Sequence, residues 1–202
     1  MIHVIPGMGA DHQMFSASAW RALPSAQFHD WPCYRGEKTI SAIAERVISE
    51  AQIGDGDTVI GTSLGGIVGC EIANRRQLHL LVLIGSAQSS KEISALLTLL
   101  HPLATLAPLD FIRTAAGKLP GELCEMFSNS DADFIRAMCC AIFTWPGLEA
   151  SRMRPLRIHG RHDHVIPPPA SADLLLDGGH LIAMTHATEC VAYLQSAQPW
   201  NL

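Results

Sequence analysis

The chain has 202 residues, 48% of which are hydrophobic, and a formal net charge of −5. This length and composition predict one globular domain with a sizeable core and leave little room for two independent domains. No run of basic residues is longer than Arg75-Arg76. The sequence therefore does not indicate binding of nucleic acid or of an anionic membrane, and a small neutral or acyl-type ligand fits better.

The first residues, Met-Ile-His-Val-Ile-Pro-Gly, have the pattern of a buried strand and lack the charged and apolar regions of a secretory signal. We therefore expect a cytoplasmic protein. The longest apolar stretch, Ile93 to Leu109, is too short and too interrupted by His101 and two prolines to span a membrane. The six cysteines form no C-x-x-C pair, which favours buried free thiols over a zinc or redox site.

Short runs of Val, Ile and Leu alternate with helical segments, which is typical of parallel strands joined by crossover helices. Strands are predicted at Ile2–Ile5, Gln27–Trp31, Thr58–Gly61, Leu78–Ile84, Leu156–His159 and Ala172–Leu176. Helices are predicted at Gln13–Ala22, Thr39–Ala51, Leu64–Arg75 and Ile182–Gln195. The predicted fold is a three-layer α/β/α sandwich with about six mostly parallel strands.

The strand pattern stops between residues 89 and 146. Short helix-like pieces separated by Pro and Gly replace it, at Ile93–Leu100, Pro108–Lys118, Gly121–Ser128 and Asp133–Thr144. This change in pattern predicts a helical cap, residues 89–146, inserted into a core made of residues 1–88 and 147–202.

The strongest functional motif is Gly61-Thr62-Ser63-Leu64-Gly65, between a predicted strand and a predicted helix. A G-x-S-x-G in this context holds the serine on a sharp turn and exposes its hydroxyl as a nucleophile. The amide N–H of Leu64, at the start of the helix, is then a donor to a developing oxyanion. The alternative interpretation is a glycine-rich turn with a serine that caps the helix.

The loop after the first strand, Pro6-Gly7-Met8-Gly9-Ala10-Asp11, contains two glycines that allow the backbone to turn towards the serine. We expect the Met8 N–H to be the second oxyanion donor. Such a loop could instead bind phosphate, but neither the dinucleotide fingerprint nor the P-loop motif is complete here.

A serine hydroxyl needs a base, and His180 is predicted to supply it from the loop between the last strand and the last helix. Asp163, in the loop after another predicted strand, is the predicted acid that orients this histidine. The chain order Ser63, Asp163, His180 places each residue just after a strand, at one edge of the sheet. His186, inside the last predicted helix, is the less suitable histidine.

His159, His162 and His164 surround Asp163 in sequence, and this group could also be interpreted as a metal site. The spacing matches none of the zinc-hydrolase helix motifs. We therefore expect no metal ion here.

These motifs resemble the α/β-hydrolase superfamily, and its esterase-like members in particular, along essentially the whole chain. Many of those members have His-Gly in the first loop, where this chain has Pro6-Gly7. The resemblance implies an α/β-hydrolase fold with a helical cap, and we expect the leading antiparallel hairpin of larger members to be missing. It also implies a serine hydrolase with the triad Ser63, Asp163 and His180.

The predicted function is cleavage of a small carboxylic ester or thioester through an acyl-enzyme, without a cofactor. The alternatives are a lyase or C–C bond hydrolase with the same triad, or a ligand-binding protein with little turnover. The partner is a small-molecule ester or acyl substrate, and the sequence does not predict the oligomeric state. The expected substrate-binding residues are Asp11, His12, Ser86, Phe134 and Trp145. The two aromatic residues could instead belong to the core.

Overall fold

The computed structural model describes residues 1–93, 126 and 130–197. Within these residues, six strands form one sheet in the order β2-β1-β3-β4-β5-β6, and every neighbouring pair is parallel. The strands are β1 (Ile2–Ile5), β2 (Ala26–Phe28), β3 (Thr58–Thr62), β4 (Leu80–Ile84), β5 (Leu156–Gly160) and β6 (Leu174–Leu176). The prediction of a sheet with about six mostly parallel strands is confirmed.

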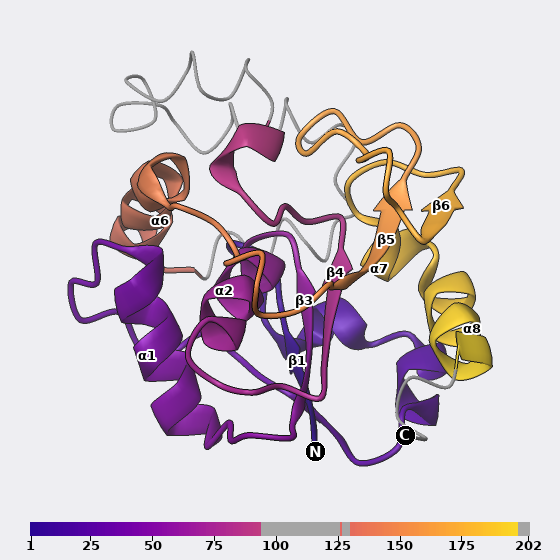
Figure 1. Cartoon of the computed structure of the whole chain (residues 1–202), viewed down its shortest axis with the longest axis horizontal. Helices are drawn as coiled ribbons and strands as arrows, with labels where there is room; N and C mark the ends of the chain where they lie inside the picture. Colours follow the sequence, from indigo (N-terminus) through magenta and orange to yellow (C-terminus); the bar gives the residue numbers. More distant parts are fainter. Residues whose placement is uncertain (94–125, 127–129, 198–202) are drawn as a thin grey trace.

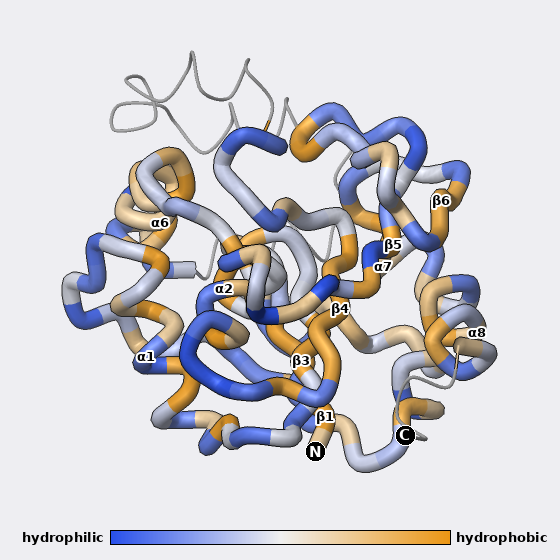
Figure 2. The backbone as a smooth tube through the Cα atoms, viewed as in Figure 1, coloured by the Kyte–Doolittle hydropathy of each residue, from blue (hydrophilic) through white to orange (hydrophobic). Residues whose placement is uncertain are grey.

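Helices cover both faces of this sheet (Figure 1). The α-helices are α1 (Ile40–Ala51), α2 (Leu64–Ala73), α6 (Ala132–Thr144), α7 (Ile182–Thr185) and α8 (Ala187–Ala197). The 3-10 helices are η1 (His12–Phe15), η2 (Ser18–Ala22) and η3 (Ser90–Glu92). Because both faces are covered, the central strands β1, β3, β4 and β5 are buried almost throughout. The hydrophobic colour in Figure 2 follows β4 and parts of the helices that cover the sheet.

Two cores lie on opposite faces of the sheet. The first, here called the α1 core, joins the sheet to α1, α2 and α6 and includes Val47, Val68 and Met138. The second, the α8 core, joins the sheet to η2, α7 and α8 and includes Trp20 and Leu194. Successive residues of a strand point to opposite faces, so one strand contributes to both cores.

Local sequence explains where α1 and α2 form. The Thr39 hydroxyl accepts a hydrogen bond from the Ala42 N–H at 3.1 Å and caps α1, which buries Ile43 and Val47 against the sheet. All ten residues of α2 are buried, because this helix lies between the sheet and α1. The carboxyl group of Glu71, on α2, is bonded to Arg75.

The prediction of one helix across Gln13–Ala22 is wrong. The chain forms η1 and η2 instead, with Ala17 between them at a ψ of 134°. This break lets Phe15 and Trp20 meet edge to face, with ring centroids 5.2 Å apart, and both rings enter the α8 core. Aromatic burial therefore outweighs the helical preference of the segment.

The last predicted helix, Ile182–Gln195, is divided into α7 and α8 at His186, whose φ is −131°. The Thr185 hydroxyl bonds the Leu181 carbonyl oxygen at 3.2 Å and His186 Nδ1 at 2.8 Å. Side chains that bond the local backbone in this way compete with regular helix bonding.

Of the predicted cap, the structure describes η3, α6 and their flanking residues. The predicted pieces Ile93–Leu100, Pro108–Lys118 and Gly121–Ser128 lie outside the described residues apart from Ile93 and Met126. The piece predicted at Asp133–Thr144 is confirmed as α6, which lies against α1 and adds to the α1 core.

The two ends of this segment meet beside α2. The Leu148 N–H donates to the Gln88 carbonyl oxygen at 2.8 Å. Gly147, the residue before Leu148, has a φ of +106°, and a Cβ added to it would be 2.9 Å from the Gln88 oxygen. Only glycine fits this close approach without strain.

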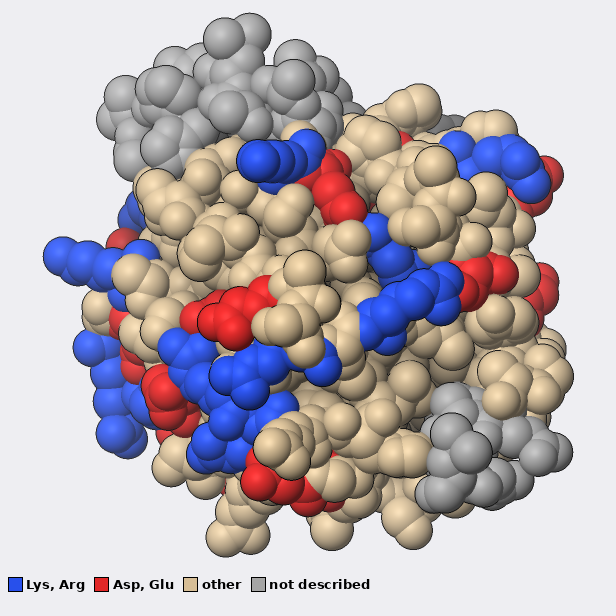
Figure 3. All heavy atoms as spheres, in the orientation of Figure 1, with Lys and Arg blue, Asp and Glu red and all other residues tan. Residues whose placement is uncertain are grey.

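No helix among the described residues is long and apolar enough to cross a membrane. Acidic and basic side chains lie beside one another on the face drawn in Figure 3. The described ion pairs include Arg75–Glu45 at 2.6 Å and Arg154–Asp173 at 2.5 Å.

Candidate active site

The strand order of the sheet marks the carboxyl ends of β1 and β3 as the place where a ligand is expected. The chain passes from β1 to β2 on one side and then to β3 on the other, so the strand order reverses between β1 and β3. Open α/β sheets bind ligands at the carboxyl ends of the strands at such a switch point. The loop after β1 and the turn after β3 both lie there.

Ser63 is on that turn, with φ 51° and ψ −118°, a backbone conformation that is strained for a non-glycine residue. Glycines allow the sharp turn: a Cβ on Gly61 would be 2.3 Å from the Gly65 oxygen, and a Cβ on Gly65 would be 2.4 Å from the Ile5 oxygen. The Ser63 side chain makes no capping hydrogen bond to α2. The serine is therefore not held there as a helix cap.

His180 reaches Ser63 from the loop between β6 and α7. Its Nε2 lies 2.9 Å from Ser63 Oγ, which is hydrogen-bond distance. Two glycines let this loop come close to the sheet: Gly85, with a φ of +53°, would place a Cβ 2.9 Å from the His180 oxygen, and Gly160 would place one 2.1 Å from the Gly179 oxygen.

Asp163 holds the other side of the imidazole, with its Oδ2 2.8 Å from His180 Nδ1. Its Oδ1 accepts hydrogen bonds from the amides of Val165 and Ile166, each at 2.9 Å. Burial by itself would raise the pKa of Asp163, but hydrogen bonds from His159, His180 and Ile166 lower that pKa well below its usual range. Asp163 is therefore a carboxylate at neutral pH, and it fixes the His180 tautomer with the proton on Nδ1.

Two backbone amides lie near the serine: that of Leu64, the next residue in the sequence, and that of Met8, in the loop after β1. The loop that carries Met8 touches the turn, since a Cβ on Gly7 would lie 3.5 Å from Ser63 Cβ. Among the described residues, neither the Met8 nor the Leu64 amide N–H has a hydrogen-bond acceptor. Unpaired amides are uncommon away from solvent, and two beside a serine hydroxyl can stabilise a developing oxyanion.

No family model matches the sequence, and no curated protein matches it either. Solved structures match the fold. An esterase from Exiguobacterium antarcticum has a TM-score of 0.72 and 17% identity, over 98% of this chain and 91% of that one. An enol-lactonase from Burkholderia xenovorans LB400 has a TM-score of 0.68 and 21% identity, over 96% and 89% of the two chains.

The chain has the α/β-hydrolase fold. A further structure with this arrangement is the RedJ thioesterase of the prodiginine biosynthetic pathway in Streptomyces coelicolor. It has a TM-score of 0.69 and 17% identity, over 96% of this chain and 88% of that one.

In this α/β-hydrolase fold the histidines around Asp163 have different partners. His159 is fully buried, and its Nε2 lies 2.7 Å from the Ile166 carbonyl oxygen and 3.3 Å from Asp163 Oδ2. His162 bonds Asp177 at 2.8 Å on the surface, and His164 is exposed. Within this fully described stretch, no three metal-binding side chains converge. His159 instead supports the carboxylate.

Ser86 lies under the turn. Its hydroxyl donates to the Ser63 carbonyl oxygen at 2.6 Å, and the residue is fully buried. A Cβ on Gly66 would be 2.3 Å from Ser86 Oγ, so the serine fills the space below the start of α2. This placement does not support the expectation that Ser86 touches substrate, because its hydroxyl is already used to hold the backbone of Ser63.

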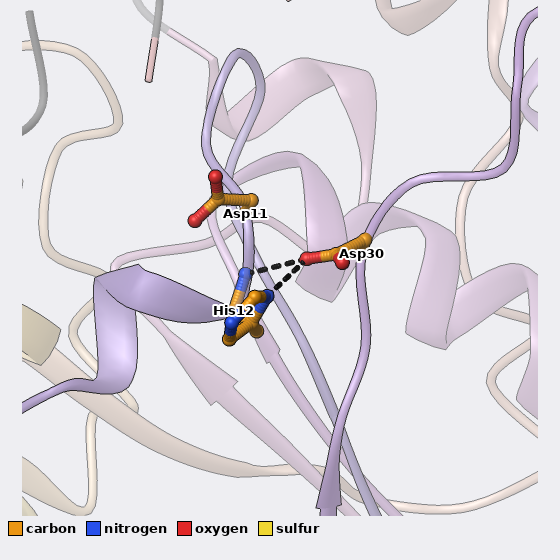
Figure 4. Close-up of side chains that lie close together, drawn as sticks. All are labelled: Asp11, His12 and Asp30. Carbon is orange, nitrogen blue, oxygen red and sulfur yellow. Dashed lines mark hydrogen bonds and ion pairs between the residues drawn. The ribbon is translucent and has the colours of Figure 1, made fainter. Parts of the chain in front are cut away.

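Asp11 and His12 follow the Met8 loop, and of the two only His12 points to Asp30 (Figure 4). Asp11 Oδ1 accepts from the Gln13 N–H at 2.8 Å and caps η1. His12 Nδ1 lies 2.7 Å from Asp30 Oδ1, and this hydrogen bond raises the pKa of His12. The two carboxylates and the imidazole lie close together, and His12 and Asp30 are exposed to solvent.

The two predicted aromatic residues have different surroundings. Phe134, on α6, contacts Trp31, with ring centroids 5.2 Å apart. Trp145 is 3% exposed and donates its indole N–H to Glu71 Oε2 at 3.0 Å, so it lies against α2 as part of the α1 core. The placement of Trp145 supports the alternative interpretation, a core residue.

Three residues near the site have positions that the sequence analysis did not predict: Trp31, Ser86 in its supporting position, and His159 beside the acid. Trp31 donates its indole N–H to the Gly7 carbonyl oxygen at 2.9 Å. The sequence offers no local signal for this contact. The signal for His159 was present, since it is the penultimate residue of the buried strand β5 and lies four residues before Asp163.

Proposed function

We propose that this chain is a serine hydrolase that cleaves small carboxylic esters or thioesters through an acyl-enzyme. The observation that carries the proposal is the continuous hydrogen-bond path from Asp163 Oδ2 through His180 to Ser63 Oγ, with distances of 2.8 and 2.9 Å. A path of this kind activates a hydroxyl near neutral pH.

In the first half of the reaction, Ser63 Oγ attacks the carbonyl carbon and passes its proton to His180 Nε2. The carbonyl π electrons move to the oxygen, and the N–H groups of Met8 and Leu64 stabilise the resulting anion. When the tetrahedral intermediate collapses, the bond to the leaving alcohol or thiol breaks. His180 returns its proton to that leaving group.

In the second half, His180 removes a proton from water, and the hydroxide attacks the acyl-enzyme. The intermediate collapses to release the carboxylic acid, and Ser63 regains its proton. Asp163 stays ionised throughout and stabilises the imidazolium form of His180. The reaction needs no cofactor, because the residues named here move every proton.

Similar folds support the ester-bond class. The three solved structures above are named an esterase, an enol-lactonase and a thioesterase. Lyases and C–C bond hydrolases can use the same residues, but none of these names points to them. Substrate profiling would identify the acyl group and the leaving group.

The proposal includes the division into a core, residues 1–88 and 147–202, and a cap, residues 89–146. Phe134 is the cap residue that we expect to influence the acyl chain, because it contacts Trp31 beside the Met8 loop. In a series of p-nitrophenyl esters, Phe134→Ala should change the chain length that is cleaved fastest. An unchanged profile with lower stability would assign Phe134 to the core.

The direct test is labelling with a fluorophosphonate, followed by mass mapping of the modified residue. Ser63 should be labelled in the parent protein, and Ser63→Ala should not react. A screen of p-nitrophenyl esters and acyl thioesters of graded chain length then identifies the substrate class. Labelling of another residue, or no labelling of the parent, would overturn the proposal.

A further inference from the structure

One hydrogen bond from outside the proposed catalytic residues holds the loop that carries Met8. The Trp31 indole N–H donates to the Gly7 carbonyl oxygen at 2.9 Å. The same oxygen accepts the Ala10 N–H at 3.2 Å, which closes the turn of the loop. Trp31 follows β2, so this contact ties the loops after two neighbouring strands together.

The Gly7 carbonyl and the Met8 N–H belong to the same peptide group. That group is planar, and no peptide bond among the described residues is cis. In a trans peptide the C=O and the N–H point in opposite directions, so a bond that fixes one also fixes the other. A donor that holds the Gly7 oxygen therefore sets the direction of the Met8 N–H.

We propose that Trp31 is a positioning residue for the oxyanion hole, acting through the Gly7–Met8 peptide. This inference rests on the proposed function, in which the Met8 N–H stabilises the oxyanion formed at Ser63. Such donors accelerate the reaction because they are already oriented when charge develops. A loop with glycines on both sides of Met8 has little stiffness of its own, and the indole restricts rotation of the peptide.

The hydrogen bond from Trp31 to the Gly7 oxygen also strengthens the Met8 N–H as a donor. Hydrogen bonds in a chain polarise one another, so donation to the Gly7 oxygen makes the Met8 N–H a better donor. The effect is strongest when negative charge is present on the substrate oxygen. It therefore stabilises the transition state more than the bound substrate.

Trp31 is itself held by α6. Phe134 contacts the Trp31 ring at a tilt of 45°, and Tyr34 lies on Phe134 with ring centroids 6.0 Å apart. The same helix reaches the loop directly, since Cys139 Sγ lies 3.5 Å from Met8 Sδ. Two contacts from α6 thus support the loop, one through Trp31 and one on Met8.

The test compares Trp31→Phe with a matched variant, Trp20→Phe. Trp20 also donates a buried indole N–H to a backbone oxygen, that of Ala183 at 3.0 Å, but it does so in the α8 core. Both variants lose one indole N–H and part of a ring. Trp31→3-benzothienylalanine, which keeps the ring shape and lacks the N–H, serves if Trp31→Phe folds poorly.

We expect Trp31→Phe and the benzothienyl variant to lower kcat and kcat/KM equally, by about tenfold, with KM unchanged. That is less than the loss of a whole oxyanion donor, since the Met8 N–H remains. The affinity for a boronic acid that forms a tetrahedral adduct should weaken by a similar factor. Trp20→Phe should lower the melting temperature while kcat stays within about twofold of the parent.

A kcat for both Trp31 variants as high as that of Trp20→Phe would overturn the inference, and so would a rise in KM at constant kcat. In either case the parent still hydrolyses esters and still reacts with the fluorophosphonate, so the proposed function stands. If the parent neither reacts nor hydrolyses, the proposed function fails, and the inference fails with it.

Discussion

Two regions of the molecule contain the same sequence of groups: a carboxylate that is hydrogen-bonded to an imidazole, which is in turn hydrogen-bonded to a third side chain. In one, Asp163 bonds His180, which faces Ser63. In the other, Asp57 Oδ2 lies 3.3 Å from Nε2 of His3, and Nδ1 of His3 lies 3.0 Å from His29 Nε2. We call them the serine chain and the histidine chain.

In each chain the carboxylate accepts a hydrogen bond from one imidazole N–H, which leaves the opposite ring nitrogen as an acceptor. The difference lies in what surrounds that nitrogen. In the serine chain it faces a hydroxyl on a strained turn beside two unpaired amides. In the histidine chain it faces another imidazole, and His3 lies within β1 with 1% of its surface exposed. An Asp–His pair therefore does not define an active site by itself.

Removing the serine or the histidine of the serine chain should have the largest effect on activity. Ser63→Ala and His180→Ala should each lower kcat by up to about 10⁶-fold, the scale known for serine–histidine pairs. Ester hydrolysis under single-turnover conditions measures the loss. His186→Ala, in the same part of the chain, should retain activity. The opposite result for the two histidines would show that the wrong base was chosen.

Changing the acid should have the next largest effect on activity, about 10⁴-fold for Asp163→Asn, because His180 then loses its correct tautomer. This variant should also change acid stability. The folded protein lowers the pKa of Asp163, so the unfolded chain binds its proton first as the pH falls.

The stability contributed by Asp163 is therefore complete above its ordinary pKa, near 4, and decreases as the pH falls towards the lower folded-state pKa. Urea unfolding between about pH 5 and pH 2.5 should give a shallower pH dependence for Asp163→Asn than for the parent. An identical slope would mean that the carboxyl group is not stabilised as described.

A substitution in the histidine chain should change the free energy of unfolding but not kcat. Burial lowers the pKa values of both His3 and His29. The unfolded chain therefore takes up protons first as the pH falls through about 6.5, and the free energy of unfolding decreases. His29→Gln should reduce this decrease between pH 7.5 and pH 5.5, measured by urea unfolding. A loss of kcat at pH 7.5 greater than about twofold would contradict the separation of the two chains.

The last substitution, of Ser86 below the Ser63 turn, should have a small effect on stability. Ser86→Ala removes one of the donors to the Ser63 carbonyl oxygen, which keeps the N–H groups of Gly66 at 3.0 Å and Ile67 at 3.2 Å. The free energy of unfolding should therefore fall by only about 0.5–1.5 kcal/mol, the net value of one hydrogen bond. We expect kcat to fall by less than about tenfold, since Ser63 keeps its backbone bond to Ile84 at 3.1 Å. Full loss of activity would make Ser86 a direct participant in the reaction.

Local patterns were sufficient to predict the sheet and the members of the serine chain. Several strands are short runs rich in Val, Ile and Leu with a glycine or proline at one end, as in β1 and β4, and Ser63 has glycines two residues away on both sides. Asp163 and His180 were found because each follows a strand end, and the carboxyl ends of parallel strands share one edge.

Contacts between distant segments could not be predicted in the same way. The contacts of Trp31 with Gly7 and of Trp145 with Glu71 depend on the tertiary arrangement of the sheet and α2. The break between η1 and η2 likewise depends on the packing of Phe15 and Trp20 in the α8 core. Residue propensity carries no information on such pairings, because tertiary packing decides them.

The bond between Gln88 and Leu148 has a consequence for how this architecture can be modified. Since the Leu148 N–H bonds the Gln88 carbonyl oxygen at 2.8 Å, the two ends of the intervening segment lie side by side, as in a closed loop. The entropy of closing a loop grows only slowly with its length, by about 0.6 kcal/mol per doubling. Segments of different length can therefore be joined at Gln88 and Leu148 at little entropic cost, provided that each replaces the contacts that α6 makes in the α1 core.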